Sequence, residues 1–284
     1  MAKLLKGAPV AAALTEKLQA RTMMLKEQGI TPTLAIVRVG ERADDLSYER
    51  GILKRAEKIG LGVRKFVLPD DCSQEALLDV IHEVNKRNDL HGCLMFRPLP
   101  AHLDETSVCE SLDSAKDIDC ITMGSLAGTF AARPKGFPPC TAEAVVRLLE
   151  YYGYELCGAD VCVVGRSLVI GKPVSVMLQA KNATVTMCHT KTRNLAEHCR
   201  AADILVVAAG HAKTIGAAFV HEDQIVVDVG INWDADAAQL VGDVDFEAVE
   251  SLVAAITPVP GGVGSVTTAV LAQHVVEAAE RTVA

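Results

Sequence analysis

Short apolar runs alternate along most of the chain with segments whose apolar residues recur at helical spacing. The runs are rich in β-branched residues and predict strands at residues 33–39, 63–68, 92–96, 161–164, 183–188, 204–209 and 224–229. The segments between them predict helices at residues 9–29, 44–59, 73–86, 106–112 and 267–281, and two more that begin at Cys140 and after Pro173. Alternating strands and helices are typical of a parallel sheet covered by helices, so we expect an α/β protein.

The chain is long enough for more than one domain. Its 284 residues can form one large or two ordinary domains. A stretch rich in Gly, Pro and Ala ends at Pro139 and interrupts the alternation. The helix that follows begins at Cys140, with Thr141 as its expected N-cap. We therefore place the passage from a first to a second domain at this point.

Composition and charge exclude several classes of protein. Half of the residues are hydrophobic, which indicates a globular protein. The net charge of −8 and the lack of a basic tract argue against a nucleic-acid partner. No apolar run approaches the length of a membrane span, so we expect no membrane partner and a cytoplasmic protein. Nine cysteines without a Cys-x-x-Cys pair are typical of free thiols in a reducing compartment, and we expect no metal site.

Residues 161–173 carry the clearest candidate chemistry. They read Val-Cys-Val-Val-Gly-Arg-Ser-Leu-Val-Ile-Gly-Lys-Pro and predict a strand, a tight loop and a helix. Glycines let backbone N–H groups and a helix N-terminus approach a phosphate, so anion binding is the first hypothesis. The signal is incomplete, because the dinucleotide motif Gly-x-Gly-x-x-Gly has three glycines and this loop has only Gly165 and Gly171. The alternative interpretation is that both glycines only close a strand-to-helix turn.

The end of the next predicted strand bears on the choice of nucleotide. Rossmann folds place an acidic residue there when the ribose carries a free 2′-hydroxyl, and a basic residue when it carries a phosphate. Here the strand ends in His189-Thr190-Lys191-Thr192-Arg193, without a carboxylate. Together with Arg166 in the loop, this ending favours NADP over NAD. The alternative is an ordinary solvated loop, since single Lys and Arg residues are common in turns.

Other predicted strands also end in residues that suit a ligand site. Arg97-Pro98-Leu99-Pro100 forms a stiff loop, because proline restricts its own backbone and that of the preceding residue. The strands at 204–209 and 224–229 end in Gly210 and in Gly230-Ile231-Asn232. Open α/β sheets bind ligands beyond the carboxyl ends of their strands, so we expect a cofactor to lie across these glycines.

Four motifs together resemble one known family. They are Val-Val-Gly-Arg-Ser-x-x-x-Gly-x-Pro at residues 163–173, Cys-His-Thr-Lys-Thr at 188–192, Gly-Asp-Val-Asp at 242–245 and Thr-Pro-Val-Pro-Gly-Gly-Val-Gly at 257–264. With them the chain resembles, over nearly its whole length, the FolD family of methylenetetrahydrofolate dehydrogenase/methenyltetrahydrofolate cyclohydrolases. The last motif is very specific for this family.

The resemblance implies two α/β domains. An N-terminal α/β domain, residues 1–140 with 268–284, is expected to bind folate, and a Rossmann-type domain, residues 141–267, is expected to bind NADP. The C-terminal helix is expected to return to the first domain, and a cleft between the domains to hold the substrate. The implied partners are tetrahydrofolate derivatives, and the family is usually a homodimer through the nucleotide domain.

The resemblance also implies roles for individual residues. For the cofactor these are Gly165, Arg166 and Ser167 at the phosphates, Thr190 with Arg166 at the 2′-phosphate, and Gly230, Ile231 and Thr267 near the nicotinamide. For substrate binding and catalysis they are Tyr48, stacked on the pterin, Asp119, bonded to its amino-pyrimidine edge, and the cleft residues Leu99, Pro100, Val259, Pro260, Gly261 and Gly262. Without the resemblance, Tyr48 would be an ordinary amphipathic helix residue, Asp119 a turn former and the prolines loop punctuation.

The chain departs from the family pattern in the first domain. The family's Tyr-x-x-x-Lys motif, whose lysine is central to the cyclohydrolase step, reads Tyr48-Glu49-Arg50-Gly51-Ile52. The glutamine that supports this lysine in the family is replaced by Phe96. The two changes are consistent with each other, because a buried lysine without its partner is costly. In addition, Cys120 stands where the family has a glycine after Asp119.

These departures predict weak or absent cyclohydrolase activity with dehydrogenase activity retained. Hydride transfer to NADP needs two rings held face to face, whereas hydrolysis of the methenyl product needs a positioned proton-transfer group. One alternative is a fully bifunctional enzyme in which Lys54, Arg97 or a water near Tyr48 replaces the lysine. The other is a folate-binding protein without catalysis, which the intact cofactor motifs disfavour.

Overall fold

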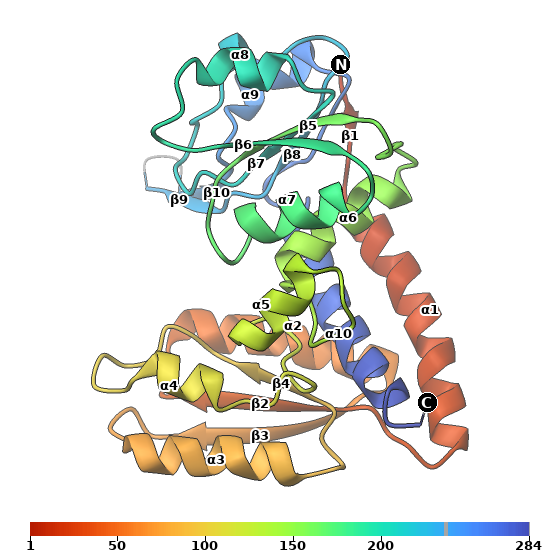
Figure 1. The fold of residues 1–284 in the computed structure, drawn as a ribbon, viewed down its shortest axis with the longest axis vertical. Coiled ribbons are helices and arrows are strands. Elements are labelled where there is room, and N and C mark those ends of the chain that lie inside the picture. The colour runs from red at the N-terminus through yellow and green to blue at the C-terminus, as the bar shows by residue number, and fades with distance from the viewer. Residues whose placement is uncertain (236–237, 284) are drawn as a thin grey trace. The chain divides into compact units, whose positions relative to one another are not determined.

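The computed structural model describes residues 1–235 and 238–283 (Figure 1). The chain divides into two compact units. The three-stranded unit contains residues 13–140 and 268–284, and the six-stranded unit contains residues 1–12 and 141–267. Helices α1 (Gly7–Glu27), α6 (Cys140–Tyr151) and α10 (Gly264–Glu280) each contribute residues to both units.

The three-stranded unit contains a parallel sheet with the strand order β3-β2-β4. Its strands are β2 (Thr33–Val39), β3 (Gly62–Leu68) and β4 (Gly92–Met95). Its own helices are α2 (Ala43–Ile59), α3 (Gln74–Lys86), α4 (Glu105–Glu110) and α5 (Met123–Phe130). Each strand and helix that the sequence predicts between residues 33 and 96 is present, with ends that differ by one residue at most.

Strand β2 explains why both faces of this sheet are covered. Neighbouring residues of a strand point to opposite faces. On one face, Ala35 and Val37 belong to an apolar core that also contains Leu77 of α3. On the other face, the buried Arg38 guanidinium pairs with the Glu49 carboxylate of α2 at 3.1 Å. The central strand is therefore buried on both faces, as parallel sheets require.

The six-stranded unit contains a parallel sheet with the order β1-β11-β8-β7-β5-β6. Its strands are β1 (Lys3–Leu4), β5 (Asp160–Val164), β6 (Thr184–Cys188), β7 (Ile204–Val207), β8 (Ile225–Asp228) and β11 (Ala255–Ile256). A separate antiparallel pair is formed by β9 (Asn232–Asp234) and β10 (Gln239–Val241). The shorter helices are α7 (Gly171–Gln179), α8 (Leu195–Arg200) and α9 (Phe246–Val249), with 3-10 turns η1 (Ala217–Phe219) and η2 (Glu250–Leu252).

The order of the strands changes direction at β5. Strand β6, which follows β5 in the chain, pairs on one side of it, and β7 pairs on the other. Open α/β sheets bind ligands at such a switch point, beyond the carboxyl ends of the strands. The glycine-containing loop at residues 165–171 follows β5 at this point. The expected α/β fold, with a Rossmann-type sheet and a C-terminal helix that returns to the first domain, is confirmed.

Residues 1–12 correct the expected division of the chain. The sequence placed them in the first domain, but they belong to the six-stranded unit. The reason is β1, which pairs in parallel with β11. The backbone N–H groups of Lys3 and Leu5 donate to the carbonyls of Ala254 and Ile256, each at 2.8 Å. A strand of two residues is too short to leave a periodic pattern in the sequence.

The predicted N-cap of the helix that begins at Cys140 is also wrong. Helix α6 already begins at Cys140, so Thr141 lies inside its first turn and is not the N-cap. The first N–H of the helix, that of Cys140, donates instead to the Asp119 carboxylate at 3.2 Å. A cap that comes from 21 residues upstream leaves no local signal. The sequence also assigned no element to α5 or to the β9–β10 pair.

Candidate active site

The loop after β5 requires glycine for steric reasons. Gly165 has φ +142°, and a Cβ at this position would lie 2.3 Å from the Ala208 carbonyl oxygen at the end of β7. A Cβ at Gly171 would lie 2.3 Å from the carbonyl oxygen of Gly165. The loop therefore folds back on itself and against the neighbouring strand, which brings its backbone close to the switch point.

Ser167 holds this loop at the start of helix α7. Its hydroxyl oxygen accepts hydrogen bonds from the backbone N–H groups of Ile170 at 3.1 Å and Gly171 at 3.4 Å. Arg166 beside it is exposed. A helix N-terminus with a nearby guanidinium provides partial and full positive charge on one side of the loop, which suits a phosphate.

A cavity of about 280 Å³ opens at the ends of β5, β6 and β7. It is lined by Val164, Gly165, Arg166, Ser167, His189, Thr190, Leu195, Ala208, Ala209, His211 and Thr214. Four of the cofactor residues that the sequence predicted, Gly165, Arg166, Ser167 and Thr190, therefore line one cavity. The lining contains no carboxylate among the described residues, so the wall of the cavity is compatible with an anion.

Several lining residues were not predicted from the sequence. The His189 ring nitrogen Nδ1 accepts a hydrogen bond from the Lys191 backbone N–H at 3.1 Å, and the His189 backbone N–H donates to the Thr192 hydroxyl at 2.8 Å. These bonds fix the turn that presents Thr190. His211 and Thr214 follow β7 in the chain and reach the same cavity. Their only signal in the sequence is the strand end at Gly210. This signal does not show which of the following side chains points into the cavity.

The residues expected near the nicotinamide lie at the end of β8 and the start of α10. Gly230 is buried, and a Cβ there would lie 2.2 Å from Asp243 Cγ. Ile231 is 63% exposed, and its Cδ1 would lie 3.6 Å from a Cβ at Gly264, the first residue of α10. Thr267 is one turn further along this helix and is half-buried. Ile231 thus presents an apolar surface beside the start of α10.

The segment at residues 259–262 occupies another part of the six-stranded unit. The Val259–Pro260 peptide bond is cis, and both residues line a second cavity of about 180 Å³. Gly261 has φ +104° and is exposed, whereas Gly262 is buried. A Cβ at Gly262 would lie 2.5 Å from the Pro258 carbonyl oxygen, so the close turn requires this glycine.

In the three-stranded unit, Tyr48 and Phe96 contact each other. Their ring centroids are 6.1 Å apart at an interplanar angle of 83°, an edge-to-face arrangement. Tyr48 is 40% exposed, whereas Phe96 is 7% exposed. Although one face of Tyr48 is open, burial around its hydroxyl raises the phenol pKa, and the nearby Cys140 and Asp119 add to this shift. Tyr48 is therefore a neutral hydrogen-bonding group at ordinary pH.

Ile52 lies one helical turn after Tyr48 and is 2% exposed. The position that holds a lysine in the Tyr-x-x-x-Lys pattern is thus a buried apolar one. Of the four cations of α2, Arg50, Lys54 and Lys58 are exposed, and the Arg55 guanidinium donates to the Thr15 hydroxyl at 2.7 Å. None of these side chains stands at the position of the lysine in the pattern.

Three further cations of this unit have carboxylate partners. Arg38 and Lys65 both pair with the buried Glu49. Because of these two partners, the Glu49 pKa is lowered in spite of burial, which by itself raises it. Arg97 pairs with Glu105 at 3.4 Å, and the same carboxylate accepts a hydrogen bond from the Leu99 N–H at 2.8 Å.

The loop around Leu99 and Pro100 is consequently held by its own contacts. The Arg97–Pro98 peptide bond is cis, Leu99 is buried and Pro100 is half-buried. Glu105, at the start of α4, fixes the loop through the Leu99 backbone. The stiffness that the sequence predicted from its prolines therefore has a second source in Glu105.

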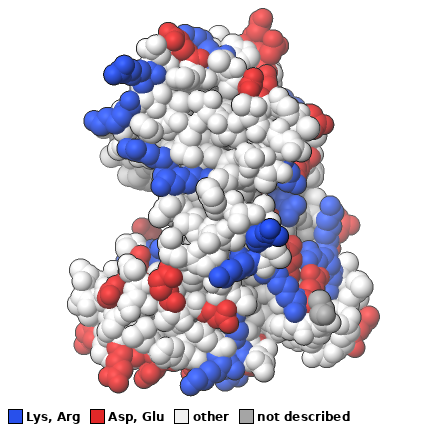
Figure 2. All heavy atoms as spheres, in the orientation of Figure 1, with Lys and Arg blue, Asp and Glu red and all other residues white. Residues whose placement is uncertain are grey.

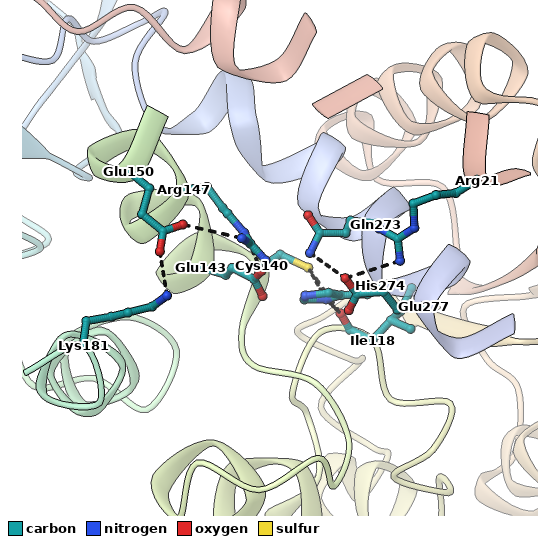
Figure 3. A network of polar contacts seen from close by, with 10 residues as sticks. All are labelled: Arg21, Ile118, Cys140, Glu143, Arg147, Glu150, Lys181, Gln273, His274 and Glu277. Carbon is teal, nitrogen blue, oxygen red and sulfur yellow. Dashed lines mark hydrogen bonds and ion pairs between the residues drawn. The ribbon is translucent and has the colours of Figure 1, made fainter. Parts of the chain in front are cut away.

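Asp119 accepts a hydrogen bond from the Cys140 backbone N–H. Figure 3 shows the Cys140 thiol beside His274 and Ile118. The Cys140 thiol is 3.6 Å from His274 Nδ1, and both groups contact the Ile118 carbonyl oxygen, at 3.2 Å and 2.8 Å. Since a carbonyl only accepts, His274 carries its proton on Nδ1. Burial raises the pKa of Asp119, and the hydrogen bonds from Cys140 oppose this shift. The sequence predicted Asp119 and missed both of its neighbours.

Cys120 adopts the left-handed conformation, with φ +59°. Glycine suits such a position best, because other residues are strained there. Burial raises the pKa of the Cys120 thiol to about 12, so it is a neutral group. The side chain lies 3.9 Å from the Thr129 hydroxyl of α5. Cys120 thus keeps the turn after Asp119 although it adds a side chain.

Charge on the molecular surface does not gather into one basic face in the view of Figure 2, where Lys and Arg are interspersed with Asp and Glu on each unit. This distribution agrees with the net charge of −8. Among the described residues, no helix combines the length and the apolar composition needed to cross a membrane.

Two family models match the chain. The catalytic domain of tetrahydrofolate dehydrogenase/cyclohydrolase matches residues 5–119, and the NAD(P)-binding domain of the same family matches residues 139–283. Among similar proteins, the bifunctional protein FolD of Carboxydothermus hydrogenoformans is 50% identical over 281 residues, which are 99% of this chain and 98% of that protein.

Solved structures agree with these matches. The bifunctional FolD of Campylobacter jejuni has a TM-score of 0.95 and 36% identity, covering 99% of this chain and 100% of that one. The Trypanosoma brucei FolD, solved with NADP and an inhibitor, has a TM-score of 0.91 and 33% identity, covering 99% of this chain and 98% of that one. The chain therefore belongs to the tetrahydrofolate dehydrogenase/cyclohydrolase family.

Proposed function

We propose that the protein is an NADP-dependent methylenetetrahydrofolate dehydrogenase of one-carbon metabolism whose cyclohydrolase step is weak or lost. The dehydrogenase activity follows from membership of the family. The single observation that carries the second part is that two residues near Tyr48 are buried and apolar: Ile52, one helical turn after it, and Phe96, in contact with its ring.

The residues at the switch point fit NADP. Gly165, Arg166 and Ser167 would hold its phosphates, and Arg166 with Thr190 its 2′-phosphate, in a cavity whose described lining has no carboxylate. Gly230, Ile231 and Thr267 would flank the nicotinamide. When bound, the nicotinamide supplies the hydride acceptor.

The three-stranded unit would hold the folate. Tyr48 would stack on the pterin, Asp119 would accept from its amino-pyrimidine edge, and Leu99 and Pro100 would line the site. An ionised Asp119 is the acceptor that such an edge requires. Its carboxylate is oriented in advance, because one oxygen already accepts from the Cys140 N–H.

The two reactions of the family place different demands on these residues. Hydride transfer requires the two rings to be oriented and water to be kept away, and no protein acid or base has to act. Addition of water to the methenyl carbon requires proton transfers by a positioned group. The neutral Tyr48 phenol, beside Phe96 and Ile52, suits the orientation of rings for hydride transfer much better than the proton transfers of hydrolysis.

Two alternatives have less support. A fully bifunctional enzyme would need a replacement for the lysine, but Lys54 is exposed and Arg97 pairs with Glu105. A folate-binding protein without catalysis would have no use for the cavity at residues 165–167 and 190. We further propose a homodimer and a cytoplasmic location, both by analogy with the family.

The proposal is tested with purified protein, methylenetetrahydrofolate and either NADP or NAD. Absorbance of methenyltetrahydrofolate is followed together with that of the reduced cofactor. We expect both to rise with NADP, and to rise much more slowly with NAD. Equal or faster rates with NAD would contradict the assignment of Arg166 and Thr190, and no reaction with either cofactor would contradict the dehydrogenase assignment.

A further inference from the structure

Two buried carboxylates lie beside Gly230, where the nicotinamide would bind. Neither takes part in the reactions described above. Asp228, at the end of β8, is 3% exposed, and Asp243, in the Gly-Asp-Val-Asp motif, is 0% exposed. Both belong to the six-stranded unit. Buried carboxylates are costly, so their arrangement calls for a reason.

Asp228 ties together the two loops that follow β8 and β10. One of its oxygens accepts from the N–H groups of Gly230 at 2.9 Å and Asp243 at 3.0 Å. The other oxygen accepts from the Val244 N–H at 2.9 Å. A Cβ at Gly242 would lie 1.8 Å from this second oxygen, so the backbone contact requires glycine.

Asp243 makes the reciprocal contacts. Its oxygens accept from the Asn232 side-chain amide at 2.9 Å and from the Gly210 N–H at 2.8 Å. It also packs against Gly230, where a Cβ would lie 2.2 Å from its Cγ. Each carboxylate thus packs on a glycine that is close in the chain to the other carboxylate: Asp228 on Gly242, and Asp243 on Gly230. Together they fix the loops after β7 and β8, at Gly210 and at residues 230–232.

In the part of the chain that the structure describes, neither carboxylate is ion-paired with a cation. The charged residues that share the 180 Å³ cavity with Asp228 are Lys213, Asp245 and Glu247. Net negative charge is therefore held inside the unit, hydrogen-bonded to Gly230 and Asn232, the two chain neighbours of Ile231.

We propose that Asp228 and Asp243 are positioning residues that also favour the oxidised cofactor over the reduced one. The inference rests on the proposed function, because it needs the nicotinamide near Gly230 and Ile231. The oxidised ring carries one positive charge, which is lost when it accepts a hydride. Fixed negative charge near the ring therefore stabilises bound NADP⁺ relative to bound NADPH. NADP⁺ is the form of the cofactor that oxidation of methylenetetrahydrofolate consumes.

The size of the effect follows from Coulomb's law. At an effective dielectric constant of about 20, a unit charge about 10 Å from the ring changes the ratio of the two affinities by roughly tenfold. For a two-electron couple, a tenfold change corresponds to about 30 mV in the potential of the bound cofactor. Both quantities are accessible to binding experiments without turnover.

The test compares dissociation constants of NADP⁺ and NADPH for the intact chain and for the variants Asp228→Asn and Asp243→Asn. We expect each variant to raise the ratio of the NADP⁺ to the NADPH constant by about tenfold. Glu247→Gln is the matched control, since it removes a carboxylate from the same cavity at an exposed position, and we expect the ratio to stay unchanged. Gly242→Ala keeps both charges but displaces Asp228. We therefore expect it to raise the dissociation constants of NADP⁺ and NADPH by the same factor.

The unsubstituted protein gives the same test through pH. Burial raises the pKa of Asp228 to about 6, and the charge of Asp243 adds to the shift. The ratio should therefore rise as the pH falls below about 6, whereas protonation of the 2′-phosphate affects both cofactor forms and cancels. This titration decides the question if a variant does not fold.

The outcomes separate this inference from the function on which it rests. A ratio that stays the same in both Asn variants and across pH overturns the electrostatic role, even if both affinities decrease. Failure of the unsubstituted protein to bind either form contradicts the proposed function itself. A ratio that rises in the variants and in acid supports the inference.

Discussion

The surroundings of Gly230 in the six-stranded unit and of Tyr48 in the three-stranded unit differ in the groups that are buried there. In the six-stranded unit, buried carboxylates remain and each of their oxygens is satisfied by a backbone or amide N–H group. In the three-stranded unit, Ile52, one helical turn after Tyr48, and Phe96, in contact with its ring, are buried and apolar. On the proposed function, the first arrangement would place the nicotinamide ring, and the second would leave no cation for proton transfer at residue 52. The comparison teaches how one family fold could keep one of its reactions and lose the other.

The largest effect is expected from Gly165→Ala. A Cβ 2.3 Å from the Ala208 oxygen, at φ +142°, forces the loop away from β7. We expect NADP and NADPH to bind about 100-fold more weakly, as measured by titration. Gly153→Ala is the control, because its φ is +75° and nothing lies within 4 Å of the added Cβ. Unchanged affinity in Gly165→Ala would show that the loop does not hold the cofactor.

The next largest effect is a gain of function. We expect Ile52→Lys alone to lower the free energy of unfolding by about 3 kcal/mol, because it buries a charge without a partner. Adding Phe96→Gln should recover part of this loss and raise the rate of methenyltetrahydrofolate hydrolysis about tenfold or more. Stability is measured by urea unfolding and hydrolysis by absorbance. Ile52→Met with Phe96→Gln is the control without a cation, and an equal gain in that variant would contradict the role of the lysine position.

Asp119→Asn is expected to separate stability from function. Because the Asp119 pKa is raised in the folded protein, the protonated state favours folding. That stability is complete at a pH below the pKa of the unfolded chain and is lost as the pH rises through the folded pKa. At pH 7 the substitution should therefore stabilise the fold, by about 1 kcal/mol, while KM for the folate rises. A less stable variant would show that the carboxylate is needed as the cap of α6.

The smallest effect is expected from Ser167→Ala. The hydroxyl accepts from two backbone N–H groups of the loop, and its loss should cost about 1 kcal/mol of loop ordering. KM for NADP should increase roughly fivefold with little change in kcat, since about 1 kcal/mol corresponds to such a factor. Ser167→Thr, which keeps the hydroxyl, should restore most of the affinity. A loss in kcat alone would instead indicate that the residue acts on the reacting ring.

Much of the fold was predictable because its signals are local. The strands and helices between residues 33 and 96 follow from periodicity and from glycines at their ends, and the loop after β5 follows from Gly165 and Gly171. What the sequence missed depends on distant partners. Strand β1 exists only because it pairs with β11, and helix α6 is capped by Asp119, which lies in another segment.

The candidate site shows the same division. Gly165, Arg166, Ser167 and Thr190 were predicted, and they line one cavity. The contacts of Asp119 with Cys140, and those of Asp228 with Asp243, could not be predicted because they join residues that are 21 and 15 positions apart in the chain. A motif identifies which residues matter, whereas tertiary hydrogen bonds decide which of them meet.

The central claim is that hydride transfer is retained without hydrolysis. It is tested most directly by supplying methenyltetrahydrofolate to the purified protein and comparing its decay with that of a sample without enzyme. We predict equal decay rates in a preparation that reduces NADP when methylenetetrahydrofolate is added. Decay well above the uncatalysed rate would contradict the account, and it would mean that a group other than residue 52 carries the proton.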